Sequence, residues 1–322
     1  MAKAPSTDVA LRSIRAIRDA PETYDLKRDL APFLRHKSNH VAAAAASTAE
    51  RLEAVALAQD LVEAFLELMK DPGKRDPGCE ALIALAKALI RMGEPAARVY
   101  FAGVHHVQME GSFGPPIDAA APLRGLCAQG LARMGHPDAL QECVALLADR
   151  EPAARAGAVR AIADAGLSEG VLLLRLKALI PDANEQVTAE CFASLLRLAP
   201  GLSLEFVADF LRSHSDEIAE AAAFALGESH LQTALPLLRT AWDEITQSER
   251  KRALLHAIAL LRLDEAVEFL LARVAEDSDA AAGNALAALA SYGRDESVRG
   301  RVEEIIGKRP ALKSVFEREF RR

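Results

Sequence analysis

A helical unit that recurs along this chain of 322 residues limits its fold more than any other feature. The most regular copy covers residues 137–166, PDALQECVALLADREPAARAGAVRAIADAG. It reads as two short helices with a break near residues 149–151, and the alanine-rich second helix ends at a glycine. A pair of helices this short cannot bury its apolar faces alone. We therefore expect successive pairs to stack on one another and supply that cover.

The repeat can be followed through an apolar anchor residue late in each second helix. The anchors are Leu89, Leu131, Ile162, Leu195, Leu226, Leu260 and Leu289, at intervals of 42, 31, 33, 31, 34 and 29 residues. Four anchors are followed four residues later by a glycine, which accepts the left-handed conformation that ends a helix: Gly93, Gly135, Gly166 and Gly293. Alanines precede the anchors, and small side chains let helices approach closely. The sequence predicts an all-α protein, an α-solenoid or superhelix of about eight to nine helical hairpins.

The same pattern predicts a single repeat array with a cap at each end. Residues 1–22 would hold a capping helix, with Val9, Ile14 and Ile17 facing inward from a helix over 8–19. The repeats would cover 23–293, and 294–322 would form a basic C-terminal cap. Residues 71–78, DPGKRDPG, contain two prolines and two glycines and are predicted to be a non-helical loop.

The spacing and end motifs of the unit resemble those of a known family of helical repeats. A period near 31–33, Asp or Ser-Asp before the second helix, and A-x-x-A-L-G at its end are similar to HEAT repeats. The short HEAT-like type found in phycobilisome lyases, the bilin lyases, is the nearest form. Residues 152–166, 216–227 and 277–293 carry the resemblance. It implies a fold but no single function, since HEAT arrays serve as scaffolds, lyases, hydroxylases and DNA-repair enzymes.

The charge distribution disfavours nucleic acid as the main partner. The net charge is -7, yet residues 1–40 carry +3 and residues 299–322 carry +4, which leaves -14 for residues 41–298. An acidic body repels a polyanion over most of its surface, so we interpret the basic ends as solubilising caps. A HEAT-like DNA-binding or DNA-repair protein stays a minor alternative, because it would need a basic groove and aromatic platforms. The sequence has one tryptophan and three tyrosines.

The cysteines and the hydropathy favour a cytoplasmic protein. Cys79, Cys127, Cys143 and Cys191 form no C-x-x-C pair, and most lie at apolar positions of the repeat, as expected of buried free thiols in a reducing compartment. The first residues lack the continuous apolar core of a secretory signal. No stretch approaches 18 apolar residues without a charge, so no membrane span is predicted.

Motifs of common enzymes are missing from the sequence. It has no Walker A pattern, no G-x-G-x-x-G, no G-x-S-x-G and no H-E-x-x-H. HEAT-like deoxyhypusine hydroxylases hold a di-iron centre through His-Glu dipeptides, and this sequence has none. No catalytic residue, metal or cofactor is therefore predicted. The sequence leaves open whether the protein is an enzyme and favours a role without catalysis.

The longest interval, 42 residues, draws attention to residues 103–124, where the repeat is interrupted. A helix over 95–109 would place His106 and Glu110 four residues apart on one face. Three interpretations stay open: a metal site for which only these two ligands can be named, a groove for a partner or ligand, and a purely structural loop. The candidate binding residues of this corner are His105, His106, Glu110, Phe113, Asp118 and Arg124.

A second candidate surface is the concave face, which the second helices would line if HEAT geometry holds. Near outward positions of these helices stand Arg155, Glu190, Glu220, Arg252 and Asn284. Their mixed charges fit either a solvated face or a polar groove for another protein. Trp242 would lie late in a first helix, on the opposite side, in a packing role.

The favoured function is a non-enzymatic scaffold that binds another protein through the concave face and the corner at 103–124. The alternative is a bilin-lyase-type enzyme or accessory that acts on a bulky ligand. Such a protein needs a deep apolar groove, and aromatic residues make up only 5% of this chain.

Overall fold

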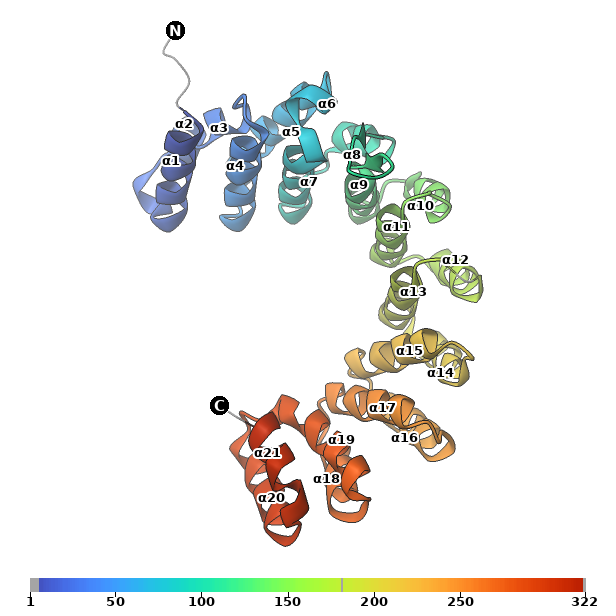
Figure 1. The fold of residues 1–322 in the computed structure, drawn as a ribbon. Coiled ribbons are helices and arrows are strands. Elements are labelled where there is room, and N and C mark those ends of the chain that lie inside the picture. Colours follow the sequence, from blue (N-terminus) through green and yellow to red (C-terminus); the bar gives the residue numbers. More distant parts are fainter. Residues whose placement is uncertain (1–5, 181, 321–322) are drawn as a thin grey trace. The chain divides into compact units, whose positions relative to one another are not determined.

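The computed structural model describes residues 6–180 and 182–320, and it is helical apart from one two-stranded hairpin (Figure 1). Helical hairpins follow one another along the chain, so the fold is an all-α solenoid, as predicted. Contacts divide the chain into two compact units, Met1–Leu173 and Leu174–Arg322. Within the described residues, no helix is both long and apolar enough to cross a membrane.

The first unit opens with α1 (Thr7–Asp19), an amphipathic helix that packs on α4. Its buried residues are Ala10, Ile14 and Ile17, spaced i, i+4 and i+7 along one stripe. Val9 was predicted to face inward, and this was wrong: it is 42% exposed. The smaller Ala10, directly below Ile14 on the helix, occupies the buried position instead.

Two rows of helices make up the rest of the first unit. Its elements are η1 (Pro21–Thr23), α2 (Leu26–Asp29), α3 (Ala31–Leu34), α4 (Asn39–Arg51), η2 (Val55–Leu57), α5 (Ala58–Leu68), α6 (Pro72–Arg75), η3 (Pro77–Cys79), α7 (Glu80–Arg91), α8 (Ala97–Val104), β1 (Met109–Glu110), β2 (Ile117–Asp118), α9 (Ala121–Arg133), α10 (Ala139–Leu147) and α11 (Pro152–Ala165). The second helices α4, α7, α9 and α11 pack in succession, and α3, α5, α8 and α10 each pack on one of them. This is the hairpin stacking that the repeat predicts.

The segment 71–78 is not the helix-free loop that its prolines and glycines suggested. It contains the short helix α6 and the 3-10 turn η3, and each begins with a proline. Proline is favoured at the first position of a helix, where its missing N–H is not needed. Between them Asp76 is fully buried, and its carboxylate accepts hydrogen bonds from the backbone N–H groups of Ala81 and Leu82. This polar connection therefore caps the start of α7.

Glycines let α9 and α11 pack with their backbones in contact. A Cβ atom built on Gly157 would lie 2.3 Å from the Cα of Gly125, and one built on Gly125 would lie 2.8 Å from the Cα of Gly157. In the second unit, a Cβ on Gly227 would meet the carbonyl oxygen of Ala257 at 2.4 Å. The expectation that small residues bring neighbouring second helices together is confirmed at these two crossings.

The second unit repeats the same two-row arrangement. Its elements are α12 (Glu169–Leu179), which spans the boundary between the units, α13 (Glu185–Leu198), α14 (Pro200–Asp209), η4 (Phe210–Arg212), α15 (Asp216–Glu228), α16 (Ala234–Glu244), α17 (Ser248–Leu260), α18 (Asp264–Glu276), α19 (Asp279–Leu289), η5 (Ala290–Tyr292), α20 (Glu296–Lys308), η6 (Pro310–Leu312) and α21 (Lys313–Glu319). The second helices α13, α15, α17 and α19 pack in succession. The first helices α14, α16 and α18 pack on them, and α21 packs on α19. Trp242, late in α16, has the expected packing role and meets the ring of Phe269 edge-on.

The anchor positions and helix ends follow the predicted pattern with two exceptions. Six of the seven anchors are fully buried, whereas Leu260 is half-buried. Gly93, Gly135 and Gly166 adopt left-handed φ angles of 69°, 68° and 68°. Gly293 was expected to do the same and does not, since its φ is -58°. The 3-10 turn η5 already closes that hairpin.

Candidate functional site

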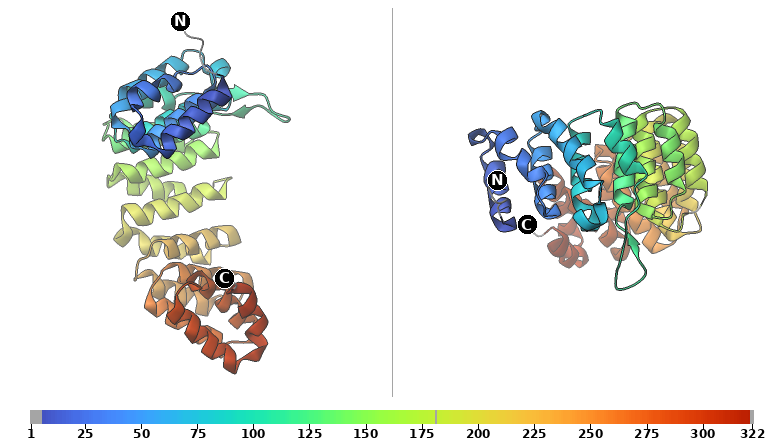
Figure 2. Two further views of the ribbon diagram at one scale, coloured as in Figure 1. Left: turned by 90° about the vertical axis from the view of Figure 1, so that its left-hand side faces the viewer. Right: turned by 90° about the horizontal axis from the view of Figure 1, so that it is seen from above.

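Residues 105–120 form a β-hairpin where the sequence predicted the end of a helix. Helix α8 stops at Val104, and β1 and β2 pair antiparallel, with Met109 opposite Asp118 and Glu110 opposite Ile117. The prediction that His106 and Glu110 share a helix face is therefore wrong. The backbone N–H of Gln108, which a helix would use internally, donates instead to the Asp118 carboxylate at 3.0 Å. Figure 2 shows the hairpin projecting from the neighbouring helices.

A buried ion network holds the base of this hairpin to the solenoid. The guanidinium of Arg124 donates two hydrogen bonds to Asp149, at 2.9 and 3.0 Å, and one to Asp118 at 2.7 Å. A further bond reaches the carbonyl oxygen of His106 at 2.9 Å. The Arg124 and Asp118 side chains are each 5% exposed, and that of Asp149 is 15% exposed. Asp118 and Arg124 thus have a structural role, holding the hairpin in place, and are not available to a ligand.

Hydrogen bonds keep Asp118 and Arg124 of this network ionised. Burial tends to raise the pKa of Asp118, but hydrogen bonds from Gln108, Arg124 and Ala120 outweigh burial and lower that pKa below its ordinary value. Burial likewise opposes the charge on Arg124, yet its bonds to Asp149 and Asp118 raise its pKa. Asp118 and Arg124 are therefore both charged at neutral pH, and their hydrogen bonds meet the condition under which a buried ion pair is tolerated.

The other polar residues of the corner are engaged in local contacts. His105 Nε2 lies 2.8 Å from a carboxylate oxygen of Glu142, and His106 Nε2 lies 3.0 Å from the side-chain oxygen of Gln108. Glu110 accepts hydrogen bonds from the Gln108 amide at 2.6 Å and from the backbone N–H of Gly78 at 2.8 Å. Among the described residues, no group of three or more His, Cys, Asp or Glu is placed to hold a metal ion.

Apolar side chains remain exposed on the hairpin. Phe113 stands at its tip with no cover, and Val107, Met109 and Ile117 are 58%, 59% and 57% exposed. The structure therefore brings His106, Asp118 and Arg124 together at the base and holds Phe113 away from them. These side chains make up an exposed apolar hairpin (Val107, Met109, Phe113 and Ile117).

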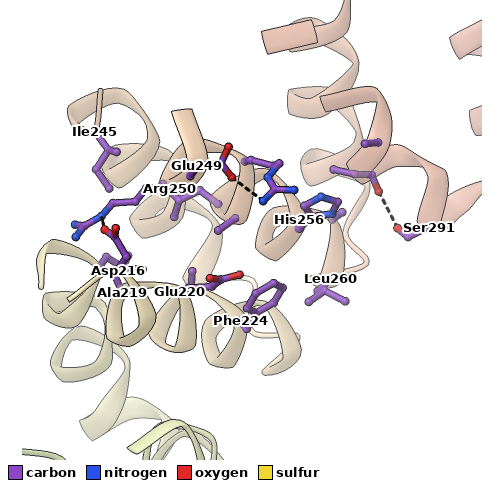
Figure 3. Close-up of a pocket in the computed structure, with 18 residues that line it drawn as sticks. Asp216, Ala219, Glu220, Phe224, Ile245, Glu249, Arg250, His256, Leu260 and Ser291 are labelled. Atoms are coloured by element: carbon purple, nitrogen blue, oxygen red, sulfur yellow. Dashed lines mark hydrogen bonds and ion pairs between the residues drawn. The ribbon is translucent and has the colours of Figure 1, made fainter. Parts of the chain in front are cut away.

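A cavity of about 570 Å³ lies in the second unit between the second helices α15, α17 and α19. We call it the unit 2 cavity. Its apolar lining includes Leu211, Phe224, Leu254 and Leu260, together with a series of alanines. The half-burial of the anchor Leu260 follows from this position. Figure 3 shows the cavity with Glu220 and Phe224 on α15 facing His256 on α17.

Most charges at the rim of the unit 2 cavity are already neutralised by a neighbour. Arg250 Nε lies 2.5 Å from a carboxylate oxygen of Asp216, and Arg252 lies 2.6 Å from Glu249 within the same helix. Glu220 is exposed and has no hydrogen bond or ion pair to another described residue. Since three carboxylates and two guanidinium groups line the cavity, a formal charge of -1 remains and lies on Glu220.

His256 is a half-buried titratable group in the lining of this cavity. Burial lowers its pKa below the ordinary value of 6.5, and the nearby Arg252 lowers it further, while Glu319 and Glu220 act in the opposite direction. The imidazole is therefore neutral at pH 7. It places a polar but uncharged wall opposite Glu220 and does not neutralise that carboxylate.

The cavity includes two of the five residues predicted on the concave face, Glu220 and Arg252. Arg155, Glu190 and Asn284 lie on α11, α13 and α19 and do not line it. Phe224 and His256 were missed by the sequence analysis. A signal for His256 was present, because the position four residues before the other anchors holds small or apolar residues: Leu85, Cys127, Ala158, Cys191, Ala222 and Ala285.

Comparisons with known proteins give information on the fold alone. No protein-family model matches the chain, and no curated protein matches it. Similar solved structures include human deoxyhypusine hydroxylase in complex with glycerol, with 18% identity over 84% of this chain and 97% of that chain and a TM-score of 0.32. The complex of CpcE and CpcF of phycocyanin lyase from Nostoc sp. PCC7120 is 12% identical over 89% and 94%, with a TM-score of 0.37. An engineered protein is 18% identical over 97% and 92%, also with a TM-score of 0.37.

These values are too low for an argument about activity or ligands. The all-helical repeat architecture is consistent with HEAT-like repeats, and the site itself has to carry any statement about function.

Proposed function

We propose that this protein is a non-enzymatic scaffold that holds a segment of another protein in the unit 2 cavity. The observation that carries the proposal is the cavity itself, about 570 Å³ of space with an apolar floor and a charged rim. Binding sites combine these features, because apolar contacts supply affinity and a few placed polar groups fix orientation. The cavity lies among the second helices and includes Glu220 and Arg252, two of the binding candidates named from the sequence.

The residues around the cavity favour binding over catalysis. The hydroxyl of Ser291, a possible nucleophile, donates to the carbonyl oxygen of Ala288 at 3.0 Å, so no base activates it. The carboxylates of Asp216 and Glu249 are engaged with arginines. Among the described residues lining the cavity, no nucleophile is hydrogen-bonded to a base, which a covalent mechanism requires.

The exposed apolar hairpin of the first unit is a second proposed contact surface. Apolar side chains that project from a solenoid commonly mark a protein interface. Its rigid attachment through Arg124 supports this role, because a fixed hairpin loses little conformational entropy on binding.

An alternative function uses the same unit 2 cavity for a bulky small molecule, as in a bilin-lyase-type enzyme or accessory. The volume falls within the range of small-molecule sites, roughly 300–1,000 Å³. The aromatic rings in the lining are those of Phe224 and His256, which offer little surface to a large conjugated ligand. Native mass spectrometry of protein purified from its own cells distinguishes the two functions, since the alternative requires a bound small molecule.

The proposed function can be tested by filling the cavity. Ala253 lines it, so Ala253→Phe should displace a bound segment, whereas Ala280→Phe adds the same ring at an exposed position of α19 outside the lining. Capture from a native extract should return a stoichiometric protein with the wild type and with Ala280→Phe, and lose it with Ala253→Phe. Equal capture by both variants, or no stoichiometric partner at all, would reject the proposal.

A further inference from the structure

On one face of α15, Glu220 has no hydrogen bond or ion pair, and the ring of Phe224 has no ring or cation contact, with any described residue. Glu220 and Phe224 are four residues apart, so their side chains are neighbours on the helix surface, and both line the unit 2 cavity. Figure 3 shows both facing the opening below His256. Because the neighbouring charges are paired, these two side chains are the part of the lining with unused binding capacity.

Phe224 differs in this respect from the other aromatic residues of its unit. Within residues 174–180 and 182–320, every other aromatic side chain contacts a second ring or lies under a cation: Phe192, Phe206, Phe210, Trp242, Phe269, Tyr292, Phe316 and Phe320. Arg175 lies over Phe206 at 4.7 Å and Arg262 over Tyr292 at 4.6 Å, so this protein repeatedly covers its rings with guanidinium groups. The half-buried face of Phe224 has no such cover.

Glu220 supplies the charge that a guanidinium group would meet. It carries the unbalanced charge of the cavity, and His256, which faces it, is neutral at pH 7. A guanidinium group is planar, stacks on an aromatic face and forms two parallel hydrogen bonds to a carboxylate. A lysine ammonium can pair with the carboxylate, but it cannot form the two parallel hydrogen bonds of a guanidinium group or stack flat on an aromatic ring.

We propose that Glu220 and Phe224 form a receptor for an arginine side chain of the partner protein. The guanidinium stacks on Phe224 and donates two hydrogen bonds to the carboxylate of Glu220. The inference rests on the proposed function, since it names what the partner segment inserts into the unit 2 cavity. The apolar floor at Leu211, Leu254 and Leu260 then receives the aliphatic stem and its neighbouring residues.

The test uses a defined probe and the whole chain. Nα-acetyl-arginine N-methylamide is titrated into methyl-labelled protein by NMR, in parallel with its citrulline and lysine counterparts. The arginine compound should shift the methyl signals of Leu211, Leu254 and Leu260, and the citrulline compound, which keeps the shape but lacks the charge, should bind at least about tenfold more weakly. Equal binding of citrulline or lysine, or no shift at these methyls, would overturn the inference.

Variants separate the two side chains from a general effect of charge. Glu220→Gln should weaken the arginine compound about tenfold and leave citrulline unaffected, while Phe224→Leu should weaken arginine severalfold. Glu228→Gln is the matched control, because Glu228 is an exposed carboxylate of the same helix outside the cavity lining. A control variant that weakens binding as much as Glu220→Gln would contradict a specific receptor.

The outcome also distinguishes this inference from the proposed function. A partner lost with Ala253→Phe but retained by Glu220→Gln and Phe224→Leu overturns the arginine receptor and leaves the scaffold intact. An arginine compound that binds through Glu220 when no partner protein is captured supports the receptor and rejects the scaffold.

Discussion

The buried network at Arg124 allows a quantitative test of how the hairpin is held. Arg124→Ala would leave Asp118 and Asp149, whose side chains are only 5% and 15% exposed, without their cation. Removing one partner of a buried ion pair costs about 3–5 kcal/mol of stability. Backbone N–H groups of Gln108, Ala120 and Glu151 still bond one oxygen of each carboxylate. The expected loss is therefore at the lower end, about 3 kcal/mol.

Arg133→Ala is the matched control in the same helix. Arg133 bonds Asp164 at 2.9 Å; the Asp164 side chain is 12% exposed, but the guanidinium is 54% exposed and screened by water, so the expected loss is only about 1 kcal/mol. With a urea m-value of about 1–3 kcal/mol/M, a loss of 3 kcal/mol lowers the unfolding midpoint by about 1–3 M. Because repeat arrays can unfold in parts, amide hydrogen exchange of residues 106–124 should be measured in the same variants in addition to the denaturation curve.

The network also predicts a dependence on pH. The pKa of Asp118 is lower in the folded protein than in the unfolded chain, so its stabilisation is complete above the ordinary pKa of 3.8 and is lost as the pH falls through the folded value. Arg124→Ala should flatten this acid slope. An Arg124→Ala variant as stable as Arg133→Ala, with unchanged exchange at the hairpin, would refute the structural role assigned to the network.

Further predictions concern helix packing, the cavity and the thiols. Gly157→Ala should destabilise the protein by about 1–3 kcal/mol, because the added Cβ meets the backbone of α9. Gly283→Ala, whose Cβ would have no neighbour within 4 Å, should be neutral or stabilising by up to about 1 kcal/mol. Calorimetry compares the two variants, and equal effects would contradict the close crossing of α9 and α11. Because the pKa of His256 is lowered in the folded protein, the imidazole takes up a proton at higher pH in the unfolded chain, and stability should fall as the pH drops below about 6.5. His256→Gln should remove this dependence of stability on pH. An unchanged dependence would exclude His256 as its cause. Burial raises the pKa of Cys143 to about 12, so its thiol should react with iodoacetamide only after unfolding, as mass spectrometry of labelled peptides can verify; rapid labelling of the native protein would disagree.

The repeat made most of the fold predictable because its signals are local and redundant. An anchor such as Ile162, a glycine such as Gly166 and the alanines between helices all indicate the same hairpin, and each agrees with the structure. The prediction failed at Val9 and Gly293, where a neighbouring residue or a closing 3-10 turn decided the outcome.

The corner at 103–124 could be located from the sequence but its geometry could not. The 42-residue interval marked it correctly as an interruption of the repeat. The end of α8 depends on Asp118, fourteen residues beyond Val104, which takes the N–H of Gln108. Such a non-local hydrogen bond leaves no periodic signal, so helical spacing was extended too far.

The unit 2 cavity was only partly visible in the sequence. Glu220 and Arg252 were identified from helix geometry, since each lies near an outward position of a second helix, Glu220 on α15 and Arg252 on α17. Phe224 and His256 belong to the same helices, but whether an arginine covers Phe224 depends on the pairing of Arg250 with Asp216 and of Arg252 with Glu249. That pairing is a property of the assembled unit and not of any one repeat.

The most direct test of the central claim is site-specific photo-crosslinking in the cells that make this protein. A benzophenone amino acid replaces Ile245, which lines the unit 2 cavity outside the proposed receptor, and in a parallel strain it replaces the exposed Ala280. We expect position 245 to crosslink to one protein, at a segment containing an arginine, with a yield well above that from position 280. Crosslinks from position 245 that do not exceed this control, or that join only residues of the same chain, would contradict the scaffold function.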